Sequence, residues 1–254
     1  MTIDVGMGPA DFERLAGRAL PGIVCVVFDV LRATSSAAMA LANGAEAILP
    51  VATVEEALEA GRHDARLLLA GEREGIRIGA ALTGGREFDF GNSPREFVRE
   101  RVGGRRIAMT TTNGTRAIRA CAGAEGVLAG SFLNLTAVGT AAAAAAMVRR
   151  SGARGILLMG SGTGEATALE DVLAVGACCE VLGGLGDFEL ADAAWVARDC
   201  WDRAKPDLPG AMARARNARR LRAMPELSPD VDWCLRVDEL ETVPALGSDG
   251  WLRG

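Results

Sequence analysis

Residues 23–28 read Ile23-Val24-Cys25-Val26-Val27-Phe28, a continuous apolar run rich in β-branched side chains. A polar turn from Asp29 to Ser35 separates this run from residues 36–42, whose small apolar side chains predict a helix that Asn43-Gly44 closes. Residues 23–44 therefore predict one strand-loop-helix unit. A strand as apolar as this one is buried on both faces, which is typical of a parallel sheet covered by helices on both sides.

The same order of elements recurs further along the chain. Strands are predicted at residues 47–51, 66–70, 106–110, 127–130 and 155–159, and helices at 54–60, after Thr115, at 135–149 and at 168–182. The pattern predicts an α/β fold with three layers, α/β/α, around a mostly parallel or mixed sheet. No linker rich in Pro, Ser or Gly divides the chain, so we expect a single domain over residues 1–254. A division of that domain into two sub-lobes, at about residues 1–125 and 126–254, stays open.

The last third of the chain departs from this pattern. Residues 191–204 and 211–224 predict two helices, residues 233–237 predict a late strand, and residues 244–254 predict a surface tail. The second helix carries the cluster Arg214, Arg216, Arg219, Arg220 and Arg222. We interpret these arginines as a solvated helix face in preference to a ligand site.

The composition is that of a soluble globular protein with a small partner. The chain has 254 residues, 49% of them hydrophobic, and its 28 Lys+Arg against 33 Asp+Glu give a net charge of −5. This hydrophobic content excludes a disordered chain, and the negative charge argues against a nucleic-acid surface. The sequence contains no run of about 18 apolar residues, the length needed to cross a bilayer, and no recognisable secretory signal. We expect a cytoplasmic protein that binds neither nucleic acid nor membrane.

Single occurrences of key residues exclude several catalytic classes. His63 is the only histidine, so a multi-histidine metal site cannot form within one chain. Lys205, the only lysine, stands between Ala204 and Pro206, which excludes a Walker A phosphate-binding loop. The cysteines include no C-x-x-C pair, and none is followed six residues later by the arginine of a cysteine-dependent phosphatase.

Polar residues follow the predicted strands at their carboxyl ends, where ligands bind in open α/β sheets. The loops read Asp29 to Ser36, Gly71-Glu72-Arg73, Thr111-Thr112-Asn113-Gly114-Thr115, Ser131-Phe132-Leu133-Asn134 and Gly160-Ser161-Gly162-Thr163-Gly164-Glu165. Glu170-Asp171 lies in the helix after the last loop. Because parallel strands end on the same side, we expect these loops to meet at one edge of the sheet.

These residue types indicate an anion site beside a hard metal ion. Loops rich in Gly, Ser and Thr that open a helix present free N–H groups to an anion. Arg32 and Arg73 can pair with phosphate, sulfonate or carboxylate oxygens. Carboxylates supply the oxygen ligands that Mg²⁺ prefers, and the candidate ligands are Asp29, Glu72, Glu165, Glu170 and Asp171.

Each motif also has a purely structural interpretation. The loop at 160–164 is G-x-G-x-G and not the dinucleotide fingerprint G-x-G-x-x-G, so taken alone it indicates a tight turn or a helix start. Asp29 could cap the segment that follows it, and Glu170-Asp171 could complement a helix dipole. Leu31 stands where aspartyl-phosphate enzymes carry a second Asp, which argues against Asp29 as a covalent nucleophile.

Several ordered segments resemble the 2-phosphosulfolactate phosphatase (ComB) family. They are Asp29-Val30-Leu31-Arg32-Ala33-Thr34, Gly71-Glu72-Arg73, Phe90-Gly91-Asn92-Ser93-Pro94, Thr110-Thr111-Thr112-Asn113-Gly114-Thr115, Gly130-Ser131-Phe132-Leu133-Asn134 and Glu170-Asp171. The resemblance covers nearly the whole chain up to about residue 180 and thins beyond it to Cys234-Leu235 and Val243-Pro244. Glu87 and residues 214–224 are less typical of the family.

The resemblance implies a ComB-like α/β fold and a Mg²⁺-dependent phosphatase that converts (R)-2-phospho-3-sulfolactate to 3-sulfolactate and phosphate, a step in coenzyme M biosynthesis. Another phosphorylated 2-hydroxy acid stays open as the substrate. We expect a water molecule to attack the phosphorus in line, with Asp29, Arg32, Asn113 and Glu165 as catalytic residues. The expected substrate-binding residues are Ser35, Arg73, Asn92, Ser93, Thr111, Thr112, Gly114, Thr115, Ser131 and Asn134.

Two other classes of function stay open. The loop Gly160–Gly164 could serve a nucleotide- or dinucleotide-dependent enzyme, and the site could belong to a non-catalytic module that binds phospho-acids. The surplus of apolar residues also leaves a homo-oligomer open.

Overall fold

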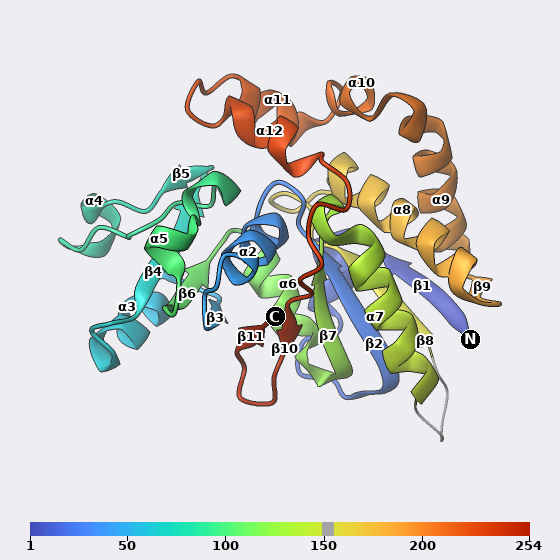
Figure 1. Cartoon of the computed structure of the whole chain (residues 1–254), viewed down its shortest axis with the longest axis horizontal. Helices are drawn as coiled ribbons and strands as arrows, with labels where there is room; N and C mark the ends of the chain where they lie inside the picture. The colour runs from blue at the N-terminus through green and yellow to red at the C-terminus, as the bar shows by residue number, and fades with distance from the viewer. Residues whose placement is uncertain (149–154) are drawn as a thin grey trace.

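The computed structural model describes residues 1–148 and 155–254 (Figure 1). Within these residues, eleven strands form one sheet in the order β5-β4-β6-β3-β11-β10-β7-β2-β8-β1-β9. The sheet is mixed, because two blocks of parallel strands are joined by a short antiparallel hairpin. The α/β class predicted from the sequence is confirmed.

The first block is built around the strand that contains the apolar run at 23–28. Its strands are β7 (Ala124–Gly130), β2 (Leu20–Phe28), β8 (Gly155–Gly160), β1 (Thr2–Gly6) and, at the edge, β9 (Glu189–Leu190). All neighbours in this block pair in parallel. The sequence analysis missed β1, although Thr2-Ile3-Asp4-Val5 alternates polar and apolar residues, and it missed β9, which has only two residues.

The second block consists of β3 (Ala47–Val51), β6 (Arg106–Thr110) and β4 (Leu68–Arg73), again in parallel. β5 (Ile76–Arg77) turns back along β4 at the edge. The strands predicted at 47–51 and 106–110 are confirmed to the residue. The strand predicted at 66–70 begins and ends later than expected, and its last residues carry Glu72 and Arg73.

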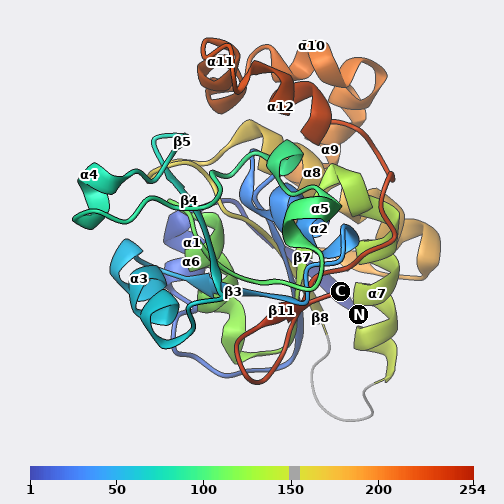
Figure 2. The same cartoon turned by 60° about the vertical axis from the view of Figure 1, so that its left-hand side comes forward.

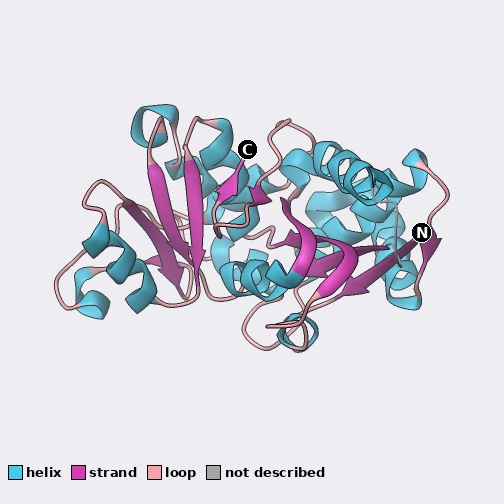
Figure 3. Ribbon diagram, turned by 90° about the horizontal axis from the view of Figure 1, so that it is seen from below, coloured by secondary structure: helices cyan, strands magenta, loops and turns pink. Residues whose placement is uncertain are grey.

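A C-terminal hairpin of β10 (Ala245–Leu246) and β11 (Leu252–Arg253) joins the two blocks. β10 is antiparallel to β7, and β11 is antiparallel to β3. All three pairings through this hairpin are antiparallel, and Figure 3 shows the two blocks meeting at an angle. The predicted surface tail at 244–254 is therefore wrong: Leu252 is 1% exposed and packs in the core between the blocks.

Helices cover both faces of the first block, which gives the three layers. α7 (Leu135–Val148), α8 (Leu169–Leu185) and α9 (Asp192–Ala204) lie on one face, and α1 (Pro9–Glu13), α2 (Ala33–Ala42) and α6 (Gly114–Ala120) lie on the other. The alternation along β2 explains both cores, because Val24, Val26 and Phe28 enter the first and Cys25 and Val27 enter the second. On the second block, α3 (Val54–His63) covers one face beside the short helix α4 (Ala80–Thr83), and the short helix α5 (Arg99–Val102) packs through Val102 into the core on the other face.

Three short helices follow α9 and lie above the strand ends, at the top of Figures 1 and 2. They are α10 (Leu208–Met212), α11 (Arg216–Arg222) and α12 (Ser228–Cys234). The continuous helix predicted at 211–224 is wrong, because the backbone is extended at Ala215. The strand predicted at 233–237 is also wrong: Val231 and Cys234, three positions apart on α12, are both buried, and an apolar run this short does not distinguish helix from strand.

Three further predictions concern the end of one helix, membrane-spanning segments and the division into sub-lobes. Residue 149, the last of the helix predicted at 135–149, lies outside the described residues. In the part of the chain that the structure describes, no helix is both long enough and apolar enough to cross a membrane. The division into two sub-lobes stays a prediction.

We expect Leu252→Ala to lower the free energy of unfolding by about 2–5 kcal/mol, because it leaves a cavity where the hairpin closes the core. Urea denaturation measures this change. Arg253→Ala, at an exposed neighbour in the same strand, is the control and should cost about 1 kcal/mol or less. Equal effects of the two substitutions would show that the hairpin contributes nothing to the core.

Candidate active site

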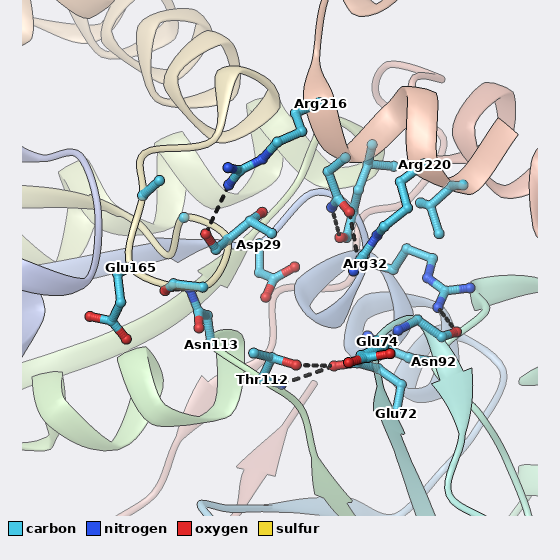
Figure 4. A pocket seen from close by; sticks show the side chains of 18 residues that line it. Asp29, Arg32, Glu72, Glu74, Asn92, Thr112, Asn113, Glu165, Arg216 and Arg220 are labelled. Atoms are coloured by element: carbon cyan, nitrogen blue, oxygen red, sulfur yellow. Dashed lines mark hydrogen bonds between the residues drawn. The ribbon is translucent and has the colours of Figure 1, made fainter. Parts of the chain in front are cut away.

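A cavity of about 550 Å³ opens where the carboxyl ends of strands from both blocks converge. β2, β4, β6 and β8 each bring the loop that follows them to this cavity, and α11 closes one side. The predicted site residues that line it are Asp29, Arg32, Glu72, Asn92, Thr112, Asn113 and Glu165 (Figure 4). Four of the five loops expected at one edge of a sheet thus meet at the junction of two parallel blocks, whereas the loop Ser131–Asn134 does not line the cavity.

Asp29 follows the last residue of β2 and is 8% exposed. Its Oδ1 accepts a hydrogen bond from the backbone N–H of Ala33 at 3.0 Å, so the carboxylate caps the start of α2. Its Oδ2 lies against α6, since a Cβ on Gly114 would stand 2.5 Å from that oxygen. Only glycine at position 114 allows this approach. In Figure 4 the Asp29 carboxylate points toward the middle of the labelled side chains.

The environment of Asp29 favours its protonated form. Its pKa is raised to about 7, first because burial penalises the charged form and further because the carboxylates of Glu72 and Glu170 are near. The Ala33 N–H and the Arg32 guanidinium oppose this increase. A buried carboxyl group of this kind in a cavity is typical of a catalytic or ion-binding position.

Asn113 joins the second block to the glycine loop of the first. Its Nδ2 donates to the carbonyl oxygens of Ser161 and Gly164, both at 3.0 Å. Its Oδ1 is buried without a hydrogen-bond partner among the described residues, and so is Oδ1 of Asn92. Buried acceptors at a cavity wall are expected to meet a donor or a cation that binds there.

Glu72 holds two loops together. Its Oε1 accepts hydrogen bonds from the N–H and the hydroxyl of Thr112 at 2.9 and 2.8 Å, and its Oε2 accepts one from the N–H of Gly75 at 2.7 Å. The carboxylate therefore fixes the loop after β6 against the turn after β4. Both of its oxygens are engaged in these contacts.

Arg32 is buried in an ion pair that sequence reasoning did not anticipate. Its Nη1 donates to Oδ2 of Asp230 at 2.6 Å, and its Nη2 donates to the carbonyl of Gly75 at 2.7 Å. Asp230 is fully buried, and its Oδ1 accepts hydrogen bonds from Ser93 Oγ and Arg95 Nε, each at 2.7 Å. The charge of Arg32 is thus balanced within the protein.

Asp171 and Glu170 do not line the cavity, although both were expected as metal ligands. Asp171 accepts hydrogen bonds from the N–H groups of Val30 and Gly162, both at 2.9 Å, and so ties the loop after β2 to the glycine loop. Burial raises the pKa of Asp171 well above its usual range, and Asp29 and Glu170 raise it further. Burial also raises the pKa of Glu170, which is opposed by the nearby arginines of α11.

The remaining predicted residues support the loops from outside the cavity lining. Ser35 Oγ donates to the carbonyl of Val30, Thr111 and Thr115 bond to each other, and Ser131 and Asn134 form a capping box. Arg73 donates to the carbonyl of Glu72 and to Thr110 Oγ1. Glu165 lines the cavity but is exposed, and in Figure 4 it lies at the outer edge of the group, beyond Asn113 from Asp29.

Sequence reasoning missed several lining residues. Arg216, Asn217 and Arg220 come from α11, and Glu74 comes from the turn after β4. Arg216 and Arg220 are exposed, as the interpretation of a solvated face predicts, but they also line the cavity, which the sequence analysis did not anticipate. The spacing of these two arginines could have indicated their position. They are four residues apart and therefore lie on the same side of the helix, and each is followed by a buried residue, Asn217 or Leu221.

The donor set of the cavity fits a hard cation with few protein ligands. Among the described residues, no group of three or more His, Cys, Asp or Glu side chains could hold a metal ion by itself. Mg²⁺, however, is usually bound through one or two carboxylates and keeps several waters. Asp29, with one oxygen that accepts the Ala33 N–H and a second beside Gly114, and the unpartnered Oδ1 of Asn113 supply oxygen ligands of the right type.

Comparison of the sequence with known protein families and with individual proteins indicates one family. A family model described as 2-phosphosulpholactate phosphatase matches residues 12–249. A relative from Caldanaerobacter subterraneus is 38% identical over 223 residues, which cover 87% of this chain and 86% of the relative. One from Symbiobacterium thermophilum is 37% identical over 246 residues, 94% of this chain and 95% of the relative, and one from Thermotoga maritima is 35% identical over 221 residues, 87% and 88%. All three carry the name probable 2-phosphosulfolactate phosphatase.

We expect Asp29→Asn to stabilise the metal-free chain at pH 8. Because the pKa of Asp29 in the folded state lies near 7 and its ordinary value is 3.8, the folded state holds a proton that the unfolded state has lost. Stability therefore falls as the pH rises from about 4 to about 7, by at most about 1.4 kcal/mol per pH unit for this group. Urea denaturation in EDTA at several pH values measures the slope.

The control for this experiment is Asp187→Asn, at an exposed position. It should leave the slope as it is in the wild type, whereas Asp29→Asn should reduce it. An Asp29→Asn chain that is less stable than the wild type at pH 8 would contradict the assignment.

We expect Asp230→Asn to lower the free energy of unfolding by about 3–5 kcal/mol, because it leaves the buried Arg32 without its counter-charge. The matched control is Asp232→Asn, at a position that is exposed and pairs only with Arg222. It should cost about 1 kcal/mol or less. Thermal or urea denaturation of the two variants side by side decides between a structural ion pair and a dispensable one.

Proposed function

The chain belongs to the 2-phosphosulfolactate phosphatase family, a family of phosphoric monoester hydrolases, and we propose that it hydrolyses (R)-2-phospho-3-sulfolactate to 3-sulfolactate and phosphate with Mg²⁺ as cofactor. The reaction takes place in the cavity around Asp29. Its place in coenzyme M biosynthesis and in the cytoplasm is part of the same proposal.

The observation that carries the proposal is the position of Asp29. In a member of this family, a cavity of about 550 Å³ contains a buried carboxyl group whose pKa is raised to about 7, and the same cavity is lined by Asn113, whose amide oxygen is buried without a partner among the described residues. A raised pKa combined with a cavity of small-molecule size indicates the reacting centre. The cavity also contains arginines, which an anionic substrate requires.

Asp29 and Asn113 are the residues that would hold Mg²⁺. When bound, Mg²⁺ supplies Lewis-acid polarisation of a phosphoryl oxygen. The Ala33 N–H fixes the orientation of the Asp29 carboxylate, and the two hydrogen bonds from Asn113 Nδ2 fix its amide. Both ligands are therefore oriented before the substrate arrives, which lowers the cost of reaching the transition state.

Other residues of the cavity bind and orient the ester. Arg32 keeps N–H groups beyond the two that bond to Asp230 and Gly75, and these can donate to the equatorial phosphoryl oxygens. Thr112 is held by Glu72, and Asn92 lies on the same wall. Among the described lining residues there is no cysteine or histidine, so a water molecule is the nucleophile: its oxygen attacks phosphorus in line, the bond from phosphorus to the lactate oxygen breaks, and one proton of the water passes to that oxygen.

The two alternative classes receive less support from the geometry. In the glycine loop, the N–H of Gly162 donates to Asp171 and the N–H of Thr163 donates to the carbonyl of Ala166, so these loop donors are engaged within the protein. A nucleotide-dependent enzyme would need such N–H groups for phosphate. In a non-catalytic binding module, a buried carboxyl group beside the bound ester would weaken binding of the anion without any gain in rate.

The proposed reaction is tested by phosphate release from (R)-2-phospho-3-sulfolactate. We expect release with added Mg²⁺, little release in EDTA, and a decrease in kcat of about 10²-fold or more for Asp29→Asn. Asp187→Asn should retain the wild-type rate. Phosphate release that survives both EDTA and Asp29→Asn would remove the metal and Asp29 from the mechanism, and no release under any condition would refute the proposed substrate.

A further inference from the structure

The charges in the cavity are unevenly distributed. The loops after the strands contribute the carboxylates of Asp29 and Glu72, whereas α11 contributes the guanidinium groups of Arg216 and Arg220. In Figure 4 the two arginines descend from α11 toward Asp29, and Thr112 and Glu72 lie on the opposite side of the Asp29 carboxylate. A bound molecule therefore meets a carboxylate side and an arginine side.

The two arginines of α11 have charge available for a ligand. Arg32 is paired with the buried Asp230, but neither Arg216 nor Arg220 forms an ion pair with a carboxylate in the described residues. Arg216 Nη2 donates to the carbonyl of Thr163 at 3.1 Å, and Arg220 Nη2 donates to Oδ1 of Asn217 at 3.0 Å. Each bond uses one N–H of a group that has five, so most of the donors stay free.

The helix that carries these arginines is held in place at the cavity. Asn217 Nδ2 donates to the carbonyl of Leu31 at 2.7 Å, which links α11 to the loop that contains Asp29. Leu221, one turn further, is buried in the core. Arg216 directly precedes Asn217 and Arg220 directly precedes Leu221, so the two anchors keep the backbone of both arginines at the wall of the cavity that Asp29 also lines.

We propose that Arg216 and Arg220 form a subsite for the non-reacting acid groups of the substrate, its carboxylate and sulfonate, and so select small phosphate esters that carry further anionic groups. The inference rests on the proposed function for the identity of the substrate. Its support is independent: the lining carboxylates of Glu72, Glu74 and Glu165 repel a multiply charged anion, and the α11 arginines offset that repulsion. Guanidinium groups pair with carboxylate and sulfonate oxygens through two N–H donors at once.

The test is calorimetric binding of the two products to the metal-free chain, because 3-sulfolactate carries the non-reacting acid groups and inorganic phosphate does not. We expect Arg216→Gln and Arg220→Gln each to weaken binding of 3-sulfolactate by about 10-fold or more, the effect of losing a charged hydrogen bond. Binding of inorganic phosphate should change by less than about 2-fold. The matched control is Arg219→Gln, on the same helix but outside the cavity lining, and it should bind both products as the wild type does.

Three results would overturn the inference: a wild-type chain that does not bind 3-sulfolactate, an equal loss of affinity for both products, or an equal loss in Arg219→Gln. Arg220→Lys, which keeps the charge, guards against loss of the helix and should bind 3-sulfolactate more tightly than Arg220→Gln. Because binding is measured without turnover, a chain that binds 3-sulfolactate through these arginines but releases no phosphate would refute the proposed reaction and leave the subsite standing.

Discussion

The buried ion pair between Arg32 and Asp230 connects the two ends of the chain at the active site. Arg32 stands at the start of α2, just after Asp29, and Asp230 lies in α12, almost two hundred positions later. Two further donors, Ser93 and Arg95, converge on the same carboxylate. Since an unpaired charge in the interior is very costly, this carboxylate holds the C-terminal helices over the strand ends.

That connection determines where the cationic side of the cavity lies. With α12 held at Arg32, α11 is placed so that Asn217 bonds to Leu31 and Arg216 reaches Thr163 in the glycine loop. The buried bond from Asn217 to Leu31 thereby holds α11 against the loop that contains Asp29. The residues proposed for catalysis and for specificity come from distant parts of the sequence, which these hydrogen bonds bring together.

The site also concentrates carboxyl groups that oppose stability. Asp29, Glu170 and Asp171 are buried close together, and burial raises the pKa of each. Asp171 accepts hydrogen bonds from the N–H groups of Val30 and Gly162 and so holds two loops together, whereas Asp29 lines the cavity. A cation beside Asp29 would offset the repulsion between these groups, which is a physical reason for a buried acid cluster to persist where an ion binds.

The sequence by itself determined the local elements and the residue types of the site. The apolar run at 23–28 predicted a strand buried on both faces, and the polar loops that follow the strands contain Asp29, Glu72 and Asn113. Such features depend on periodicity and on the nature of neighbouring residues, which can be read without a structure.

Only the tertiary structure decided which of those residues face the cavity and which hold the loops. Ser131 and Asn134 resemble substrate ligands in sequence but cap a helix turn, and Arg216 and Arg220 resemble a solvated face but line the cavity. The partner of Arg32 and the β10–β11 hairpin likewise depend on segments far apart in the chain. These outcomes follow from long-range packing, and a hydrogen bond between distant residues leaves no period in the sequence by which it could be predicted.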